Sequence, residues 1–141
     1  MKFRYSRYPT TDLRVFVEYP TVKVGIVNIK TKQVFADYIV LVDSGAAACI
    51  FHAGIGEAIG IDIKSGIEAP FSGVVKGEGK QFLHSIVLII GGHRIETEVG
   101  FSYDLNMPFG LLGQKGFFEK FRICFDLPKH EFEITPKFRS H

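Results

Sequence analysis

The residues with the strongest chemical signature are an aspartate and the three small residues that follow it. Asp43-Ser44-Gly45-Ala46 comes directly after the apolar residues 40–42. Strand-forming residues that end in a tight Ser-Gly-Ala turn predict a carboxylate carried out of a sheet, half-buried and on rigid backbone. Proteins tune the ionisation of carboxyl groups by burial and fixed hydrogen bonds. Asp43 is therefore the first candidate for catalysis; for the tripeptide alone, the alternative is an ordinary structural turn.

Two cysteine–histidine pairs raise the question of a metal site or a thiol nucleophile. They are Cys49 with His52, and Cys124 with His130. Their spacing lacks the paired knuckles of a structural zinc site. A Cys49–His52 nucleophile pair also lacks an evident third group to orient the histidine. We therefore predict no metal site, and we expect both cysteines to be small buried apolar side chains.

The composition predicts one folded domain rich in β-structure. Of the 141 residues, 46% are hydrophobic and 23% charged, and the 15 glycines suit many tight turns. A net charge of +2, from 17 basic and 15 acidic side chains, is too balanced to favour nucleic acid as the main partner. The longest aliphatic run, residues 86–90, is far shorter than a membrane span. Without a signal-peptide pattern or a cysteine framework, we expect a cytoplasmic protein without nucleic-acid or membrane partners.

The apolar pattern predicts the elements that position Asp43. Alternation over residues 22–29 indicates a half-buried strand, and residues 34–42 form a second strand that ends at Asp43. Helical spacing follows over residues 52–59, with Gly60 as its stop. Residues 61–63 have the pattern of a short strand.

The second half of the chain predicts hairpins and one more helix. Residues 82–90 and 94–101 are strands joined across Gly91-Gly92-His93, a strong signal for a tight turn. Residues 114–120 resemble a short amphipathic helix, with Phe117, Phe118 and Phe121 facing inward. Residues 121–125 and 131–134 form a last hairpin. We divide the chain into a loose N-terminal arm (1–13), a single domain (14–136) and a C-terminal tail (137–141).

Three segments in order resemble the retropepsin-type aspartic proteases. They are Leu41-Val42-Asp43-Ser44-Gly45-Ala46, the glycine-rich residues 73–79, and Leu111-Leu112-Gly113. The resemblance runs from about residue 22 to residue 134. It implies an all-β fold, a closed acid-protease (retropepsin-like) β-barrel with one or two short helices. Because the chain continues past Phe125 into another strand, it is more similar to the cellular or prokaryotic single-domain members than to the viral ones.

The resemblance also implies roles for individual residues. Asp43 would be the catalytic carboxylate, the Ser44 hydroxyl would brace the loop, and Gly45 would let its backbone approach the carboxylates. Ala46, Leu112 and Gly113 would complete the support of the active-site loop. A flap that closes over the substrate would comprise Gly73, Val74, Val75, Lys76, Gly77, Glu78 and Gly79. The alternative for these flap residues is an exposed hairpin without a role in binding.

The single Asp-Ser-Gly-Ala segment implies a homodimer, because the family's chemistry needs two aspartates. The resemblance thus implies an aspartic endopeptidase that hydrolyses peptide bonds of a peptide or protein substrate. The water would be activated between two Asp43 carboxylates, and no metal or organic cofactor would be needed. Residues 121–134 would contribute to the sheet between the two copies.

The sequence departs from the family at one bracing contact. Retropepsins often place an aspartate after the active-site motif and pair it with an arginine just after the Leu-Gly motif. Here those places hold Ala47, Ala48 and Gln114, so we expect that ion pair to be absent. The alternative function is a catalytically inactive retropepsin-fold module that binds a peptide or protein. A β-barrel that binds small ligands or nucleic acid would leave the pairing of the two motifs unexplained.

Overall fold

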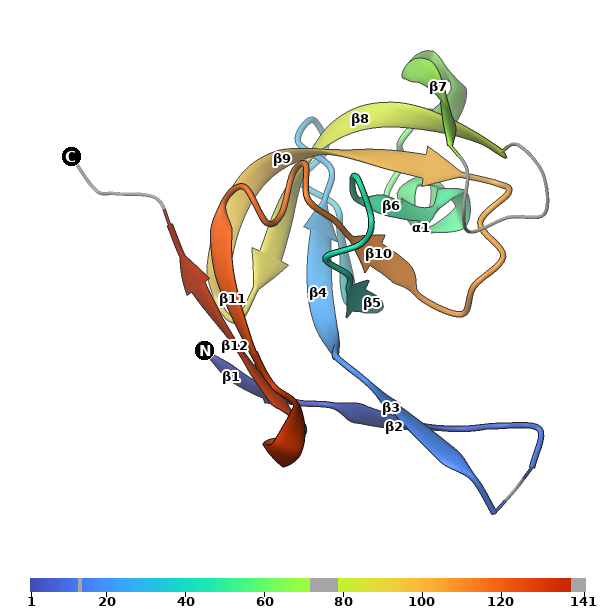
Figure 1. Ribbon diagram of the computed structural model, residues 1–141. Helices are drawn as coiled ribbons and strands as arrows, with labels where there is room; N and C mark the ends of the chain where they lie inside the picture. The colour runs from blue at the N-terminus through green and yellow to red at the C-terminus, as the bar shows by residue number, and fades with distance from the viewer. Residues whose placement is uncertain (13, 72–78, 138–141) are drawn as a thin grey trace.

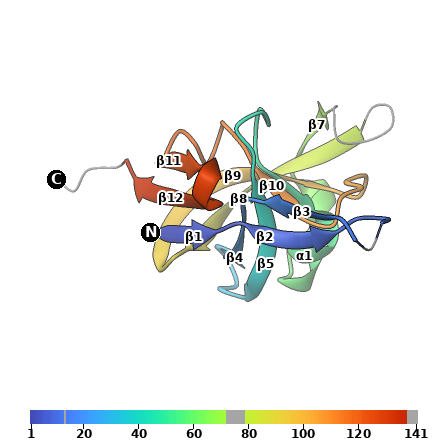
Figure 2. The ribbon, with the colours of Figure 1, turned by 60° about the horizontal axis from the view of Figure 1, so that its bottom comes forward.

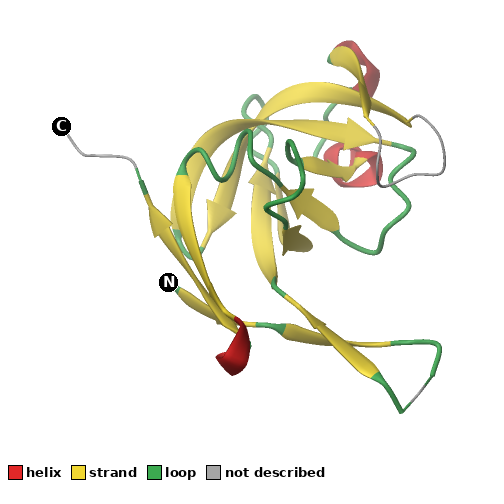
Figure 3. Cartoon of the chain, in the orientation of Figure 1, coloured by secondary structure: helices red, strands yellow, loops and turns green. Residues whose placement is uncertain are grey.

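The computed structural model describes residues 1–12, 14–71 and 79–137, and strands make up most of the chain (Figure 1, Figure 3). In chain order, the elements of the described residues are β1 (Lys2–Arg4), β2 (Ser6–Pro9), β3 (Phe16–Tyr19), β4 (Thr21–Val27), β5 (Val34–Val42), β6 (Ile50–His52), α1 (Ala53–Ala58), the 3-10 helix η1 (Ile63–Ser65), β7 (Ile67–Phe71), β8 (Gly79–Ile90), β9 (His93–Ser102), β10 (Gly110–Leu112), β11 (Phe121–Asp126), the 3-10 helix η2 (Leu127–Lys129) and β12 (Glu131–Pro136).

A seven-stranded sheet curls into a closed barrel. Its order is β4-β5-β10-β6-β9-β8-β7, and β4 also pairs with β8. This extra pairing joins β4, at one end of the sheet, to β8, the last strand but one, so that six strands form a ring and β7 lies outside it on β8. The long strand β8 makes this possible, because its first residues pair with β7 and its last residues pair with β4. The expectation of an all-β barrel with one or two short helices is confirmed.

The barrel interior holds the apolar residues that alternate along the strands. In β5 the buried residues are Tyr38, Val40 and Val42, and the residues between them are more exposed. This period of two places one face of the strand in the core. The largest fully buried side chains are Phe51, Phe101, Phe117, Phe121, Phe132, Ile26, Ile59, Ile63, Ile86, Leu88, Ile90 and Leu112.

Several sequence-based predictions of elements are confirmed. Strand β5 has the predicted bounds, and α1 lies within residues 52–59. Gly60 follows α1 with a φ of +80°, a conformation that glycine adopts without strain. The β8–β9 hairpin turns at Gly91 and Gly92, whose φ angles of +54° and +83° suit a type I′ turn.

The prediction of a loose N-terminal arm was wrong. Strand β1 pairs antiparallel with β12, and the two lie in a three-stranded sheet of order β1-β12-β11. Strands β2 and β3 form a ribbon that projects from the body of the molecule (Figure 1, Figure 2). The base of the ribbon is fixed by the ring contacts of Tyr8 and Tyr19 with Phe109 and by the contact of the Glu18 carboxyl group with the His130 ring.

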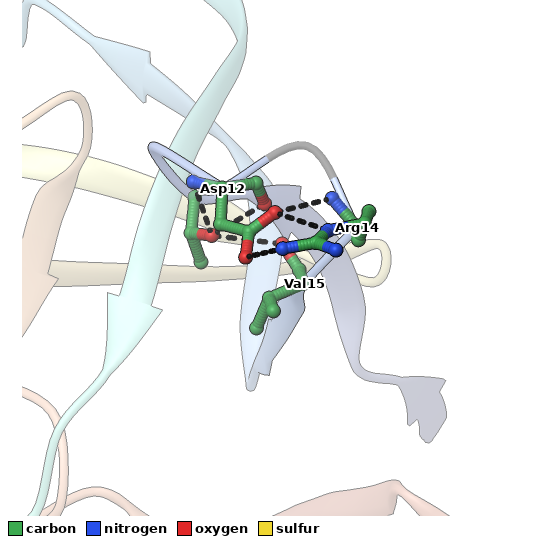
Figure 4. Close-up of polar contacts among 4 residues, drawn as sticks. Asp12, Arg14 and Val15 are labelled. Carbon is green, nitrogen blue, oxygen red and sulfur yellow. Dashed lines mark hydrogen bonds and ion pairs between the residues drawn. The ribbon is translucent and has the colours of Figure 1, made fainter.

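The ribbon ends in a turn that its own residues hold together (Figure 4). Asp12 Oδ1 accepts from the backbone N–H and the Nε of Arg14, at 3.0 and 3.2 Å, and Asp12 Oδ2 accepts from Arg14 Nη2 at 3.2 Å. The Thr10 hydroxyl donates to the carbonyl of Val15 at 2.9 Å. The Arg14 hydrogen bonds hold the pKa of the Asp12 carboxyl below its usual value.

Two further predicted elements are corrected. Residues 61–63 are not a strand; they lead into η1, because Ile63 packs against Gly56 of α1 instead of pairing with a neighbouring strand. Residues 114–120 are a series of turns rather than a helix. Gly116 has a φ of +94°, which a right-handed helix does not allow. Phe117 and Phe121 are nevertheless buried, as predicted, and Phe118 is partly buried.

Candidate active site

The Asp43 loop begins where two parallel strands end together. Strand β10 pairs with β5, with Leu112 opposite Val42. The Asp43 N–H then donates to the Leu112 carbonyl at 3.0 Å. Because Val42 and Leu112 are both buried, the backbone on each side of the loop is anchored in the core. The segments Asp43-Ser44-Gly45-Ala46 and Leu111-Leu112-Gly113, separated by about seventy residues, therefore meet at the first residue of the loop.

The loop itself is a tight turn around the Asp43 carboxylate. The Ala46 N–H donates to the Asp43 carbonyl at 3.1 Å, which closes a four-residue turn. The Gly45 N–H donates to Asp43 Oδ1 at 2.9 Å. A side chain at Gly45 would place its Cβ 3.3 Å from that oxygen, so glycine lets the backbone approach the carboxylate. Asp43 is half-buried, whereas Ser44 and Gly45 are exposed.

Residues 113–115 lie along the loop and hold it from below. The backbone N–H groups of Gln114 and Lys115 donate to the carbonyls of Ala46 and Ala47, at 2.9 and 3.0 Å. Gly113 fits so closely that a Cβ on it would lie 2.7 Å from the Ala46 carbonyl oxygen. The structure thus brings together Asp43, Ser44, Gly45, Ala46, Leu112 and Gly113, the residues that the sequence analysis assigned to one loop.

A buried thiol completes this support. Cys49 Sγ accepts from the Gly113 N–H at 3.5 Å and donates to the Lys115 carbonyl at 3.6 Å. Burial raises the pKa of the Cys49 thiol to about 11, so it stays protonated at neutral pH. Cys49 is a small buried side chain, as predicted, but Cys124 is exposed, because its side chain lies on the outer face of β11.

A side-chain contact that the sequence analysis missed also reaches the loop. Gln114 Nε2 donates to the Ser44 carbonyl at 2.8 Å. The sequence marked position 114 only as the place of an absent arginine. The signal for its role was its position directly after Leu112-Gly113. The atom that it binds depends on the shape of the loop and could not be predicted.

The Asp43 loop forms one wall of a groove of about 600 Å³. Apolar side chains dominate its lining, and Asp43 is the only charged residue among them in the described part of the chain. Pro70 and Gln81 were not predicted to contribute, and Phe71 lies two residues before the glycine-rich residues 73–79. The lining residues are Asp43, Gly45, Ala46, Ala47, Ala48, Ile50, Pro70, Phe71, Gln81 and Leu111.

A second apolar cluster lies beneath this groove. Ile50, Leu105 and Leu111 are its buried members, and Phe71 and Met107 pack against them. His52 Nε2 contacts the carbonyl of Met107, in the loop after β9, at 2.6 Å. The groove is therefore backed by packed side chains rather than by solvent.

The predicted flap lies almost wholly outside the described residues. Of its seven residues, Gly79 alone is described; it begins β8 and pairs with Phe71. Strands β7 and β8 form an antiparallel pair that ends at Phe71 and Gly79. Its end adjoins the groove, because Phe71 lines it.

Cys49 and His52 are not brought together as a reactive pair. Cys49 is bound to Gly113 and Lys115, whereas His52 Nδ1 contacts the Tyr38 hydroxyl at 2.7 Å. Within residues 1–12, 14–71 and 79–137, no group of three His, Cys, Asp or Glu side chains is placed to hold a metal ion. In the same residues, no helix is long and apolar enough to cross a membrane.

Comparison with solved structures identifies the fold. A retropepsin-like aspartic protease from Rickettsia conorii superposes with a TM-score of 0.52, covering 95% of this chain and 96% of that one at 14% sequence identity. The chain has a retropepsin-like fold. The EIAV protease in complex with an inhibitor also matches, with a TM-score of 0.47, 20% identity, and coverage of 74% of this chain and 88% of that one. No protein-family model and no curated protein matches the sequence. At these identities the likeness concerns the retropepsin-like fold alone.

Proposed function

We propose that the chain is an aspartic endopeptidase that works as a homodimer. The observation that carries the proposal is the position of Asp43, a half-buried carboxylate on a hydrogen-bonded loop in the wall of an apolar groove. A groove of about 600 Å³ with one charged group suits an extended peptide with apolar side chains. The retropepsin-like fold supports the same assignment.

The chemistry needs two carboxylates at close distance. Two such groups share one proton, because like charges in contact do not both ionise easily. The ionised carboxylate removes a proton from a water molecule, which then attacks the scissile carbonyl carbon. The protonated carboxyl donates its proton to the carbonyl oxygen. Breakdown of the tetrahedral intermediate transfers a proton to the leaving amine and splits the peptide bond. The shared proton belongs to the pair rather than to either residue.

One chain supplies only one such carboxylate. Among the other described aspartates, Asp12 binds Arg14, Asp104 accepts from the Lys80 N–H and Asp126 accepts from the Lys129 N–H. None of these lies in the wall of the Asp43 groove. A second copy with its Asp43 across a two-fold axis would supply the missing partner. Residues 121–134, which hold β11 and most of β12, would contribute to the contact between copies.

The decisive experiment replaces the carboxylate without changing its shape. We expect Asp43→Asn to keep the fold, judged by circular dichroism, and to abolish cleavage of a peptide library. The matched control is Asp37→Asn, because Asp37 is an exposed aspartate on the same strand. Cleavage by Asp43→Asn at the wild-type rate would rule out the mechanism. A statine-type transition-state mimic should raise the melting temperature of the wild type and not that of Asp43→Asn.

A non-catalytic peptide-binding module is the second candidate. The apolar lining supports it, because Ala47 and Ala48 occupy the positions at which the family often carries a charged bracing residue. Such a module would bind peptides with equal affinity in the wild type and in Asp43→Asn, and neither would cleave them. The mass of the protein in solution also separates the two functions, because a strict monomer cannot pair two Asp43 carboxylates.

A further inference from the structure

The Gln114 side chain contacts the same peptide group that holds the Asp43 carboxylate. The carbonyl oxygen of Ser44 and the N–H of Gly45 belong to one peptide unit. Gln114 Nε2 donates to this carbonyl at 2.8 Å, and the N–H at the other end donates to Asp43 Oδ1 at 2.9 Å. The three groups thus form a chain of hydrogen bonds from an amide side chain, through one peptide, to the carboxylate. Hydrogen bonds in such a chain polarise and strengthen one another.

This peptide group is the part of the loop that could most easily turn over. It is the central peptide of the turn that the Ala46 N–H closes on the Asp43 carbonyl. In such a turn, rotation of the central peptide converts type I into type II, which requires a positive φ at the third residue. That residue is Gly45, and glycine adopts either sign of φ without strain. In the structure, the φ of Gly45 lies outside the left-handed region.

The rotation would remove the contact on which the carboxylate depends. The Gly45 N–H would turn away from Asp43 Oδ1, and the Ser44 carbonyl would lose its donor. Both Ser44 and Gly45 are exposed in a single copy, so packing within the chain does little to prevent this change. The neighbouring backbone contacts of residues 113–115 reach Ala46 and Ala47, beyond the peptide in question. Among the described residues, the Gln114 amide is the group that binds the Ser44 carbonyl.

We propose that Gln114 is a positioning residue that fixes the Ser44–Gly45 peptide and, through it, the orientation of the Asp43 carboxylate. This inference rests on the proposed function for its catalytic consequence, but not for its structural one. Gln114 occupies the position of the arginine in the bracing ion pair that the sequence lacks. Because its amide is neutral, the brace does not depend on salt concentration or on the ionisation of a partner.

The structural test does not need catalysis. In protein labelled with ¹⁵N-glycine, the solvent-exchange rate of the Gly45 amide proton reports its hydrogen bond to Asp43. We expect Gln114→Ala to raise this rate at least tenfold, and the rate of Gly54 in α1 to stay unchanged. If the exchange rate of the Gly45 amide proton is the same in the variant as in the wild type, Gln114 does not fix the Ser44–Gly45 peptide.

The catalytic test replaces Gln114 by a side chain whose ability to donate a hydrogen bond depends on pH. Gln114→Glu has the same length, but an ionised carboxylate cannot donate to the Ser44 carbonyl and repels it. We expect kcat to fall about tenfold above the usual carboxyl pKa of about 4.3, with KM changed less than about twofold, and to recover below it, where the introduced group is protonated. The control is Gln33→Glu, the same replacement in the exposed turn between β4 and β5, which should leave the kinetics unchanged.

The outcomes separate this inference from the function on which it rests. If Gln114→Ala loses activity only through weaker assembly, so that kcat returns at high protein concentration, Gln114 acts on the dimer and the positioning role is wrong. If the Gly45 exchange rate rises in Gln114→Ala but no form of the protein cleaves peptide, the endopeptidase proposal is wrong. The conclusion that Gln114 fixes the Ser44–Gly45 peptide would still hold. An unchanged pH profile in Gln114→Glu would also contradict the positioning role.

Discussion

Gly113 lies so close to the carbonyl oxygen of Ala46 that a side chain at position 113 would meet it at 2.7 Å. We therefore predict that Gly113→Ala shifts the Asp43 loop and lowers the free energy of unfolding by about 1–3 kcal/mol, as overpacked sites do. Chemical denaturation would measure the loss, and peptide cleavage should fall with it. The matched control is Gly54→Ala, since a Cβ at Gly54 meets no atom within 4 Å. Equal free energies of unfolding for the two variants would show that the Asp43 loop can shift to accommodate a side chain at position 113 without loss of stability.

The dependence of cleavage on two copies gives a prediction from mixing. If each active site needs one Asp43 from each chain, a wild-type subunit that pairs with an Asp43→Asn subunit will be inactive. When equal amounts are mixed and allowed to exchange, random pairing leaves about a quarter of the dimers fully wild type. We expect the activity per total protein to fall to about that fraction rather than to about half. A fall to half would mean that each chain works alone. Cleavage of a fluorescent peptide would measure it.

The two cysteines should differ strongly in reactivity. Cys124 is exposed, whereas Cys49 is buried and burial raises its pKa to about 11. Alkylation at pH about 8 should therefore modify Cys124 at least ten times faster than Cys49, because the thiolate is the reactive form. Mass spectrometry of the digested protein would locate the label. Comparable labelling of Cys49 in the folded protein would contradict the packing beneath the loop.

The raised pKa of Cys49 also predicts how stability changes at alkaline pH. The thiol keeps its proton up to about pH 11 in the folded chain but loses it near its reference value of 9.0 when unfolded. Its contribution to stability is thus complete below pH 9 and declines as the pH rises from 9 toward 11. We expect Cys49→Ala to remove part of this alkaline decline. Denaturation series at pH 8 and about 10, in wild type and variant, would test it.

The tip of the β2–β3 ribbon should loosen in acid. The hydrogen bonds from Arg14 hold the pKa of Asp12 below the reference value of 3.8, so they favour the ionised form. The contribution of this pair is therefore present above that reference value and is lost as the pH falls through the lower, folded-state pKa. NMR signals of the Arg14 amide and guanidinium should therefore shift as the pH falls below that reference value. Asp12→Asn should show the loosened state already at neutral pH. If the Arg14 signals change neither in acid nor in Asp12→Asn, the contact between Asp12 and Arg14 does not form in solution.

The sequence predicted best where local chemistry decides the structure. Strand β5 follows from a period-two apolar pattern, and the β8–β9 turn follows from Gly91-Gly92, because both depend on neighbouring residues. The pairing of β1 with β12 depends on residues at opposite ends of the chain, so the start appeared to be a loose arm. The predicted helix over 114–120 failed because Gly116 has a positive φ and its carbonyl accepts from the Thr97 hydroxyl of β9, a long-range contact that a local pattern does not encode.

The candidate site was predicted to a similar extent. The motif chemistry located Asp43, and the structure adds that Leu112 holds its backbone. The contribution of Gln81 to the groove could not be predicted, because it depends on how β8 lies relative to the loop in the folded chain. Gln114 was marked as a departure from the family pattern, but its partner was identified only from the folded loop.

The pairing of β1 with β12 means that a single copy completes its own three-stranded sheet. Folding then needs no encounter with another molecule, and the thermal midpoint of a lone subunit should not vary with protein concentration in dilute solution. If two copies form the active site as proposed, protease activity would instead rise steeply with the amount of protein. Such a chain could accumulate as a stable, dormant subunit and become active once its local abundance passes a threshold.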